Sequence, residues 1–361
     1  MKVLIAGGGT GGHLFPGLAI AEEFHERDKD THILFVGTRK GIEARVIPQE
    51  GFTIDFITAE GLMDKGLFKG FIALVKLGLG ILKSFKIVRN FRADLVIGVG
   101  GYASFPLILA ALALRVKSVI QEQNTVPGLA NRILGRWVDK VFVAFDQALS
   151  YFPKEKGVVT GNPIRKRLLE HGPERKGEKF TILVIGGSQG SREINQVMIE
   201  ALDYLCGIRD SLKLIHQTGE KGYLEVSQAY QKKGFEAEVY PFISDMERVY
   251  PQAHLVICRA GAMSISELMV FHKASILIPY PFAASRHQEL NACELINKRA
   301  ARMIVSSDLN GQLFAQEIID LFKNPDAIAE MERKAGELSR PDAAKKIVDD
   351  CYQMIYGEVG V

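Results

Sequence analysis

The chain has 361 residues, of which 47% are hydrophobic, and a formal net charge of +3. This length suffices for two domains with their own cores, and the nearly balanced charge argues against a nucleic-acid-binding protein. The four cysteines (Cys206, Cys258, Cys293 and Cys351) form no C-x-x-C pair, so we expect neither disulfides nor a zinc site, which fits a reducing cytosol. We also expect no signal peptide, because an apolar strand pattern begins almost at the first residue.

The opening stretch MKVLIAGGGTGGH predicts a strand, a glycine-rich loop and the start of a helix. The apolar run Val3–Ala6 is typical of a buried parallel strand. Five glycines between Gly7 and Gly12 let the loop turn sharply and bring backbone N–H groups close to a ligand. Residues 14–24 predict a helix with Pro16 near its first turn. Strand, loop and helix together form the opening unit of a nucleotide-binding α/β domain.

The same arrangement recurs in the second half of the chain. An apolar strand is predicted at 180–185, followed by a glycine-rich loop, Gly186–Ser191, and a helix from Asn195 to Leu205. The distance between the two copies is about the length of one domain. We therefore expect an α/β fold with two similar doubly wound, Rossmann-like domains that face a central cleft.

Strands and helices alternate along both halves, which predicts parallel sheets. In the first half, strands are predicted at 31–36, 52–57, 95–102, 118–121 and 140–144, with a helix at 41–49. In the second half, they are predicted at 180–185, 212–216, 237–240, 254–258, 275–278 and 302–305. Gly161-Asn162-Pro163 breaks any helix and marks a connector near 158–167. A last helix is predicted at 342–356.

Residues 66–92 predict a long helix with lysines along one side. Lys69, Lys76 and Lys83 are spaced so that they share a face, and most of the remaining positions are apolar. No stretch of about 18 residues is free of charge, so the helix should not span a bilayer. Two interpretations remain open: a crossover helix packed on the sheet, and an element lying on an anionic membrane surface.

Gly7, Gly9 and Gly12 match the G-x-G-x-x-G pattern of dinucleotide-binding loops. The acidic residue expected after the second strand is missing, and Arg39 there could accept a 2′-phosphate, so an NADP-dependent oxidoreductase is one alternative. His13 directly follows the loop. The positive end of the helix dipole disfavours a cationic imidazole, so His13 could act as a neutral base. The alternative is that His13 only caps and packs.

The second half offers a fuller nucleotide site. Ser188 lies in the second glycine-rich loop, where its hydroxyl could bind phosphate. Residues 259–267 place a glycine, small residues and a hydroxyl at a helix start, which suits a pyrophosphate. Glu267 would repel phosphate, so ribose hydroxyls are its natural partners. The alternative for Glu267 is a capping or exposed helix acid.

Three further residues could bind the ligand. Gln288 and Asn291 carry amides suited to sugar hydroxyls. Arg165 could place a cation near a leaving pyrophosphate, or be a solvated linker arginine. No metal is implied, because the one D-x-D motif, at 28–30, precedes the second strand and so lies away from the ligand crevice.

Seven motifs in this order resemble the MurG family of peptidoglycan N-acetylglucosaminyltransferases, which convert lipid I to lipid II. The resemblance covers nearly the whole chain. The motifs are GGGTGGHLFPGLAIA near the start, GVGGYASFP at 98–106, EQNTVPGLANR at 122–132, GNPIR at 161–165, GGSQGSREIN at 186–195, CRAGAMSISE at 258–267 and SRHQELNA at 285–292.

The resemblance implies a two-domain GT-B fold. Residues 1–162 with 341–361 would bind the acceptor and the membrane, and residues 163–340 would bind the donor, UDP-N-acetylglucosamine. It implies inverting, metal-independent transfer without a cofactor to lipid I (undecaprenyl-pyrophosphoryl-MurNAc-pentapeptide), by a peripheral protein on the cytoplasmic face of the cell membrane. A GT-B enzyme with a soluble acceptor and a non-catalytic nucleotide-sugar sensor remain alternatives.

The resemblance also implies roles for individual residues, with His13 as the base. Ile243 would bind the uracil through its backbone, Glu267 the ribose and Gln288 the sugar. The full implied donor site is Thr10, Gly11, Gly12, Asn124, Arg165, Ser188, Ile243, Ala262, Met263, Ser264, Ile265, Ser266, Glu267 and Gln288. The family often has two consecutive glutamines where this chain has Gln288-Glu289, so a role for the second amide is open. Membrane contact is implied for Leu74, Leu77, Leu79 and Ile81, with Lys69, Lys76 and Lys83 meeting anionic headgroups.

Overall fold

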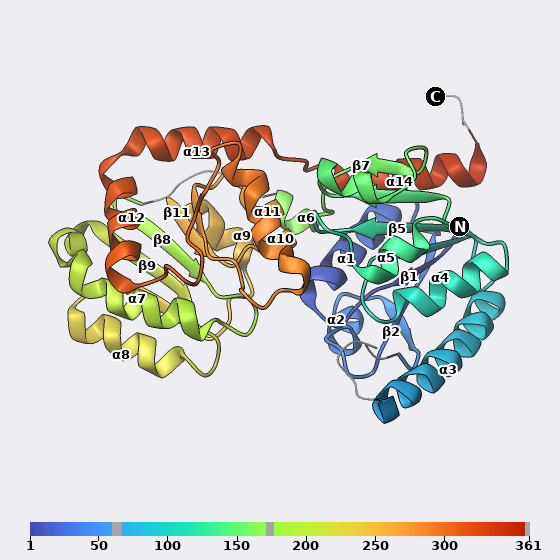
Figure 1. Ribbon diagram of the computed structural model, residues 1–361. Helices are drawn as coiled ribbons and strands as arrows, with labels where there is room; N and C mark the ends of the chain where they lie inside the picture. Colours follow the sequence, from blue (N-terminus) through green and yellow to red (C-terminus); the bar gives the residue numbers. More distant parts are fainter. Residues whose placement is uncertain (60–66, 171–176, 358–361) are drawn as a thin grey trace. The chain divides into compact units, whose positions relative to one another are not determined.

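The computed structural model describes residues 1–59, 67–170 and 177–357, and the side chains of its long helix from Val75 onward. The chain forms two compact units (Figure 1), one of Met1–Lys166 with Pro341–Val361 and one of Arg167–Arg340. The boundary expected after residue 162 lies a few residues earlier than this division. Arg165 consequently belongs to the first unit.

The first unit is built on one sheet of seven parallel strands in the order β3-β2-β1-β4-β5-β6-β7. Its strands are β1 (Lys2–Ala6), β2 (His32–Gly37), β3 (Thr53–Phe56), β4 (Leu95–Gly98), β5 (Lys117–Glu122), β6 (Lys140–Val143) and β7 (Gly157–Val159). The order of the strands reverses between β1 and β4, which is where ligands bind in open parallel sheets. Strand β7, which the sequence pattern did not predict, is a short edge strand beside β6.

Helices cover both faces of this sheet (Figure 1). They are α1 (Gly11–Arg27), α2 (Glu43–Gln49), α3 (Leu67–Phe91), α4 (Ser104–Ala113), α5 (Leu129–Leu134) and α14 (Ala343–Tyr356), with the 3-10 helix η1 (Asp146–Tyr151). Helix α1 begins at Gly11, earlier than expected, so Pro16 lies inside the helix and not near its first turn. Helix α14 packs beside α1, where the rings of Phe24 and Tyr352 are 5.8 Å apart.

The second unit repeats the same strand order in a parallel sheet of six strands, β10-β9-β8-β11-β12-β13. These are β8 (Phe180–Ile185), β9 (Leu212–Gln217), β10 (Ala237–Tyr240), β11 (Leu255–Cys258), β12 (Ser275–Leu277) and β13 (Arg302–Met303). The predicted pair of doubly wound sheets is therefore confirmed.

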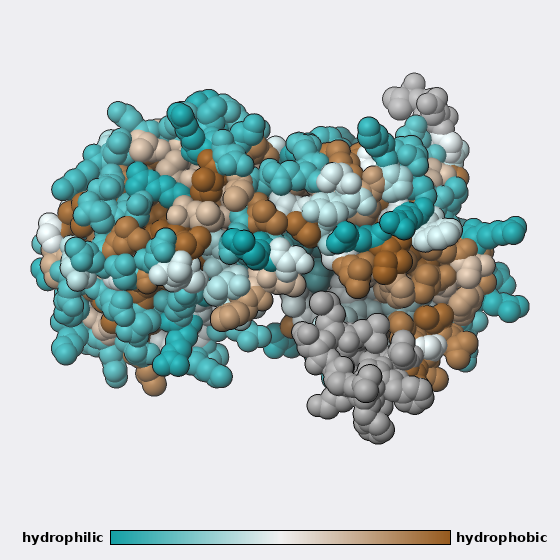
Figure 2. Space-filling model, viewed as in Figure 1, coloured by the Kyte–Doolittle hydropathy of each residue, from teal (hydrophilic) through white to brown (hydrophobic). Residues whose placement is uncertain are grey.

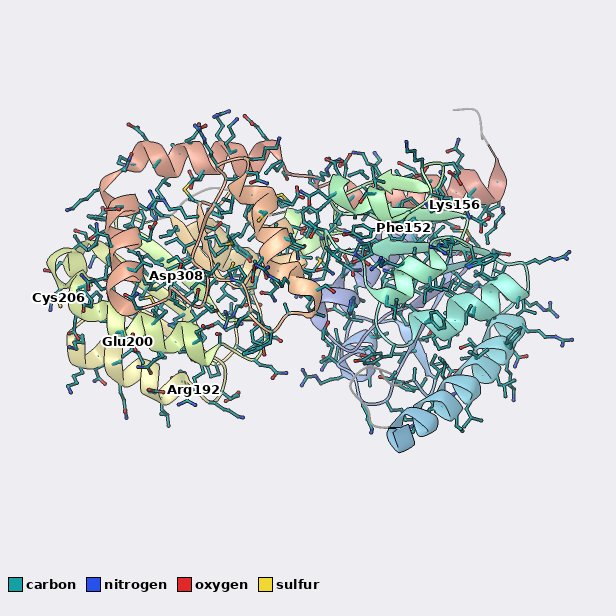
Figure 3. The ribbon with its side chains drawn as sticks, viewed as in Figure 1. Phe152, Lys156, Arg192, Glu200, Cys206 and Asp308 are labelled. Atoms are coloured by element: carbon teal, nitrogen blue, oxygen red, sulfur yellow. The ribbon has the colours of Figure 1, made fainter. Side chains whose placement is uncertain are left out.

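The helices of the second unit precede, connect and follow these strands in the chain. They are α6 (Lys166–Leu169), α7 (Arg192–Leu205), α8 (Tyr223–Lys233), α9 (Met246–Val249), α10 (Ala262–Val270), α11 (His287–Ile296), α12 (Gly311–Lys323) and α13 (Pro325–Glu337), with the 3-10 helices η2 (Cys206–Ser211), η3 (Tyr250–Gln252) and η4 (Ala284–Arg286). Arg192 and Cys206, labelled in Figure 3, mark the two ends of α7. Helix α7 buries Met198, Ala201 and Leu202 against Val184 of β8, and this core fixes the loop that precedes Arg192.

Candidate functional site

The candidate residues of both units lie on loops that follow the carboxyl ends of strands. Because all strands of each sheet are parallel, these ends share one edge. In the first unit the loops follow β1, β4 and β5, which are neighbours in the sheet, and the edge strand β7, which precedes Arg165. In the second they follow β8, β9, β10, β11 and β12.

His13 lies in the first turn of α1, at the edge formed by β1 and β4. Its Nδ1 is 3.4 Å from the hydroxyl of Thr10. Its ring lies against Gly100, where a Cβ would approach within 2.5 Å of Cδ2 and where φ is +91°, so only glycine fits comfortably. The imidazole is half-exposed. The fold thus fixes a partly accessible base candidate between the loops after β1 and β4.

Glu43, at the start of α2, is a residue that sequence reasoning missed. Its side chain is buried, and its Oε2 accepts the backbone N–H of Gly9 at 2.8 Å. Its Oε1 accepts the backbone N–H and the hydroxyl of Thr38 at 2.8 and 2.9 Å. The carboxylate therefore joins the first glycine-rich loop to the loop after β2. The sequence feature that could have identified Glu43 is its position as an acidic residue in the first turn of the helix predicted at 41–49.

This carboxylate disfavours the dinucleotide alternative. It already accepts the Gly9 N–H, and its negative charge would repel a phosphate placed on the same loop. Arg39, the candidate for a 2′-phosphate, has its guanidinium carbon 5.3 Å from the ring centre of Phe56. These two contacts therefore argue against a dinucleotide site on the G-x-G-x-x-G loop.

Asn124 is oriented by a buried acid at the end of β5. Glu122 accepts hydrogen bonds from the backbone N–H and side-chain amide of Asn124, at 3.0 and 3.2 Å. It also accepts the Gly128 N–H at 3.1 Å and the Asn131 amide at 2.9 Å. Burial raises the pKa of the Glu122 carboxyl, and these donors oppose part of that rise. The loop that carries Asn124 is therefore fixed by one carboxyl group.

Arg165 is buried against α1. Its guanidinium carbon lies 4.4 Å from the ring centre of Phe15, and its Nη1 is 3.8 Å from Oε1 of Glu50. Phe15 itself lies close to Gly11. Arg165 is thus packed near the first turn of α1, and is not the solvated linker arginine that the alternative interpretation described.

Ser188 is exposed at the tip of the second glycine-rich loop. The base of that loop is held by Arg259, which follows β11. Arg259 Nη2 donates to the hydroxyl of Ser191 at 2.8 Å and to the carboxylate of Glu193 at 2.7 Å, and Nη1 donates to the carbonyl of Ile278 at 3.2 Å. One arginine thus joins the loops after β8, β11 and β12. No local pattern in the sequence indicates these contacts.

Gln217, at the end of β9, forms hydrogen bonds to two segments of the chain that are predicted to bind the donor nucleotide. Its amide donates to the carbonyl of Gly187 at 2.8 Å, and its Oε1 accepts the backbone N–H of Ile243 at 2.8 Å. A uracil that used this same N–H would have to displace the glutamine. A polar residue at the carboxyl end of a predicted parallel strand was the signal that could have identified Gln217.

Helix α10 begins at Ala262. Its residues that were predicted to bind phosphate fall into two groups, one half-buried and one buried in the protein. Met263 and Ser264 are half-buried, whereas Ile265 is fully buried in the core. The hydroxyl of Ser266 is also directed into the protein, since Ser266 is buried and donates to the carbonyl of Ala262 at 3.0 Å. Ser264 is therefore the better-placed hydroxyl for a phosphate.

Glu267 accepts a hydrogen bond from a buried phenol. The hydroxyl of Tyr250 lies 2.9 Å from Oε2 of Glu267. Burial and the charge of Glu267 raise the pKa of Tyr250 well above its ordinary value, so the phenol stays protonated and donates. Glu267 itself is half-buried.

Gln288 and Glu289 both have partners within the second unit. Oε1 of Gln288 accepts the backbone N–H of Tyr280 at 2.8 Å, so a sugar hydroxyl would be bound through the amide NH₂. Glu289 accepts Nε of Arg286 at 2.9 Å. Asn291 is fully buried, with its amide 3.5 Å from the carbonyl of Ala260, and does not face a ligand.

Helix α3 exposes an apolar row formed by Val75, Leu79 and Leu82, which are 49%, 56% and 68% exposed. Figure 2 shows hydrophobic side chains gathered over α3 and α4. Val75 and Leu82 were not among the predicted contacts.

The other residues predicted to contact the membrane differ in how far their side chains are exposed. Leu77 and Ile81 are half-buried, and Lys83 donates to Asp55 at 3.3 Å. The side chains of Lys69 and Leu74 lie outside the described part of the chain.

The described residues contain neither a membrane-spanning helix nor a metal-binding cluster. None of the helices in that part of the chain is long and apolar enough to cross a membrane. Over the same residues, no cluster of three or more His, Cys, Asp or Glu side chains could hold a metal ion.

Comparisons with known proteins cover both units. Residues 3–143 match the glycosyltransferase family 28 N-terminal domain, and residues 181–347 match the glycosyltransferase family 28 C-terminal domain. The chain is 47% identical over 357 residues to the UDP-N-acetylglucosamine--N-acetylmuramyl-(pentapeptide) pyrophosphoryl-undecaprenol N-acetylglucosamine transferase of Myxococcus xanthus, covering 98% of this chain and 93% of that one. It is also 47% identical to the protein of the same name from Syntrophus aciditrophicus, covering 98% and 99%.

Solved structures agree with the sequence matches. The crystal structure of Acinetobacter baumannii MurG has a TM-score of 0.81 at 29% identity and covers 98% of this chain and 99% of that chain. A Neisseria meningitidis UDP-GlcNAc 2-epimerase, with a TM-score of 0.67 at 13% identity over 98% of this chain and 100% of that chain, shares the fold alone. Since both family domains occur in order and the relatives align over nearly their full length, this chain belongs to glycosyltransferase family 28 and, within it, to the MurG family.

Proposed function

We propose that this protein transfers N-acetylglucosamine from UDP-N-acetylglucosamine to the 4-hydroxyl of the muramyl sugar of lipid I, which forms lipid II for peptidoglycan synthesis. The observation that carries the proposal is the 47% identity, over nearly the full chain, to relatives named for this transfer. The arrangement of each unit supports it, because polar residues gather on the loops after the carboxyl ends of both sheets.

The second unit binds the donor nucleotide in this proposal. The loop that carries Ser188 and the first turn of α10, with Ser264, offer backbone N–H groups and a hydroxyl to the diphosphate. Glu267 binds the ribose, and the backbone of Ile243 binds the uracil. Gln288 binds the sugar through its NH₂ group, since its oxygen accepts the Tyr280 N–H.

The first unit binds the acceptor and supplies the base. His13 removes the proton from the muramyl 4-hydroxyl as that oxygen attacks C1 of N-acetylglucosamine. The bond from C1 to the UDP oxygen breaks, the configuration at C1 inverts, and UDP leaves with the electron pair. Backbone N–H groups at helix N-termini and Arg165 stabilise the charge that grows on the diphosphate. Thr10, Gly11, Gly12 and Asn124 contact the transferred sugar.

The lipid acceptor requires contact with a membrane, and we place that contact on α3. The exposed row Val75, Leu79 and Leu82 would enter the interfacial region. The basic residues Lys76, Lys86 and Arg89 on the same helix would attract anionic headgroups. This corresponds to a peripheral protein on the cytoplasmic face of the membrane, without a nucleic-acid partner.

A UDP-release assay tests the transfer. The purified protein is incubated with UDP-N-acetylglucosamine, with and without a short-chain analogue of lipid I. The mass of the lipid product is measured by mass spectrometry. We expect UDP release that depends on the acceptor, and a product heavier by one N-acetylglucosamine. UDP binding without release would favour a sensor, transfer to a soluble sugar would favour another acceptor, and tighter binding of NADPH than of UDP would favour an oxidoreductase.

A further inference from the structure

Tyr250 and Glu267 form a pair that the transfer mechanism does not explain. Tyr250 lies in η3, which precedes β11, whereas Glu267 lies in α10, which follows it. The phenol is 1% exposed, and its hydroxyl is 2.9 Å from Oε2 of Glu267. A buried hydroxyl needs a hydrogen-bond partner, and a carboxylate is the strongest acceptor available in proteins.

The ring of Tyr250 is itself held by the helix that carries Glu267. It stacks on Phe271 with ring centres 4.8 Å apart and an angle of 17° between the planes. Phe271 directly follows the last residue of α10, and its backbone N–H donates to the carbonyl of Glu267 at 2.9 Å. The phenol and the carboxylate therefore belong to one packed group, joined by a hydrogen bond and a ring stack.

The hydrogen bond has a fixed direction. Burial and the nearby carboxylate raise the pKa of Tyr250 well above its ordinary value, so the phenol keeps its proton at neutral pH. It therefore donates to Glu267, and its burial keeps it away from a ligand hydroxyl. A carboxylate with one oxygen fixed presents its remaining lone pairs in a defined direction.

We infer that Tyr250 is a positioning residue for the donor nucleotide: it holds Oε2 of Glu267 so that this carboxylate accepts a hydroxyl of the ribose. The inference rests on the proposed donor site and adds to it the residue that orients its ribose-binding acid. Without the Tyr250 hydroxyl the carboxylate would lose its orientation. The affinity for a nucleotide with ribose hydroxyls would then exceed the affinity for one without them by a smaller factor.

The test compares the affinities of the full-length protein for UDP and for 2′,3′-dideoxy-UDP, which lacks both hydroxyls, by isothermal titration. The wild-type protein should prefer UDP. Tyr250→Phe keeps the ring and its stacking but removes the hydroxyl. It should weaken UDP binding about tenfold and leave binding of the dideoxy nucleotide within about twofold. The KM for UDP-N-acetylglucosamine should rise by a similar factor with kcat nearly unchanged.

Tyr230→Phe is the matched control. Tyr230 is also 1% exposed, lies in the same unit and has its hydroxyl 2.7 Å from Nδ1 of His216, away from Glu267. This variant should change the two affinities equally or not at all. Equal loss of both affinities in Tyr250→Phe would show a merely structural role and overturn the inference.

Glu267→Ala separates failure of this inference from failure of the donor site. If the wild-type protein has no preference for UDP, or Glu267→Ala keeps that preference, the proposed ribose site is wrong. If Glu267→Ala loses the preference and Tyr250→Phe retains it fully, only the role of Tyr250 is wrong. Should Tyr250→Phe not fold, Phe271→Leu provides the second test, because it removes the stacked ring but keeps the hydroxyl. Phe271→Leu should reduce the preference for UDP over the dideoxy nucleotide, by less than is expected of Tyr250→Phe. An unchanged preference would contradict the inference.

Discussion

The carboxylate of Glu43 accepts the backbone N–H of Gly9 at 2.8 Å, so the first glycine-rich loop is held by an acid from the next helix of its own unit. The same side chain binds the N–H and hydroxyl of Thr38. A loop with the G-x-G-x-x-G spacing is thereby fixed in place without a bound phosphate. This relationship separates the first unit from a dinucleotide-binding domain of similar topology.

Glu43→Ala should destabilise the protein, because it leaves the partly buried N–H groups of Gly9 and Thr38 without their acceptor. A loss of about 1–3 kcal/mol in the free energy of unfolding is expected, measured by urea denaturation. Glu26→Ala is the control, since the Glu26 side chain is 53% exposed in its ion pair with Lys166 and should cost less than about 1 kcal/mol. Equal effects of the two substitutions would show that Glu43 does not hold the loop.

His13→Ala should remove the base from the transfer step. We expect kcat to fall by about 10²–10⁴-fold, the range that general-base catalysis supplies. The affinity for UDP should change less than about twofold, because the nucleotide is proposed to bind the second unit. Steady-state kinetics and isothermal titration measure the two quantities. His32→Ala, at an exposed position of the first unit, should leave both unchanged. Full activity of His13→Ala would exclude His13 as the base.

His216 should make the stability of the protein depend on pH. Burial lowers its pKa from about 6.5 to about 3, so the native state keeps it neutral while the unfolded chain takes up a proton below about pH 6.5. The contribution of His216 to stability is thus fully present above pH 6.5 and is lost as the pH falls toward 3. Between pH 6.5 and 5 the loss should be about 2 kcal/mol.

Urea denaturation at these two pH values measures this difference. His216→Phe should lose less free energy of unfolding than the wild-type protein over the same interval. His32→Gln, which removes an exposed histidine, should behave as the wild-type protein does. An identical pH dependence in His216→Phe and the wild-type protein would contradict the assignment of the proton to His216.

The exposed row on α3 should bind lipid. The double variant Leu79→Ser and Leu82→Ser should reduce sedimentation with vesicles that contain anionic phospholipid by at least about tenfold, because burying a leucine in an apolar environment contributes about 1.5–3 kcal/mol. Its affinity for UDP should not change. Leu224→Ser on α8 is the matched control, since Leu224 is 69% exposed and Leu82 is 68% exposed. Equal vesicle binding by all three proteins would remove α3 from the membrane surface.

The sequence was sufficient for elements whose signal is local. Strands such as Phe180–Ile185 and Ala237–Tyr240 were predicted with the bounds that the structure has. Glycines and a histidine that adjoin such a strand in sequence could be assigned to its carboxyl end. Strand β7 escaped prediction, because Gly157–Val159 is too short for a periodic pattern and gains its structure by pairing with β6.

The contacts that hold the site were not predictable in the same way. Arg259 binds Ser191 and Ile278, which are distant in sequence, and no local pattern marks such a meeting. Ser264 and Ser266 are two residues apart in one motif, yet the turn of the helix directs Ser266 into the protein. That distinction depends on the exact start of α10, and helix boundaries are poorly specified by sequence.

The position of UDP in a crystal structure of the complex is the most direct test of the account. We predict that the diphosphate lies on the loop of Ser188 and the first turn of α10, with a ribose hydroxyl within hydrogen-bond distance of Glu267. UDP bound to the loop of Gly7–Gly12 alone, without contact to the second unit, would contradict it.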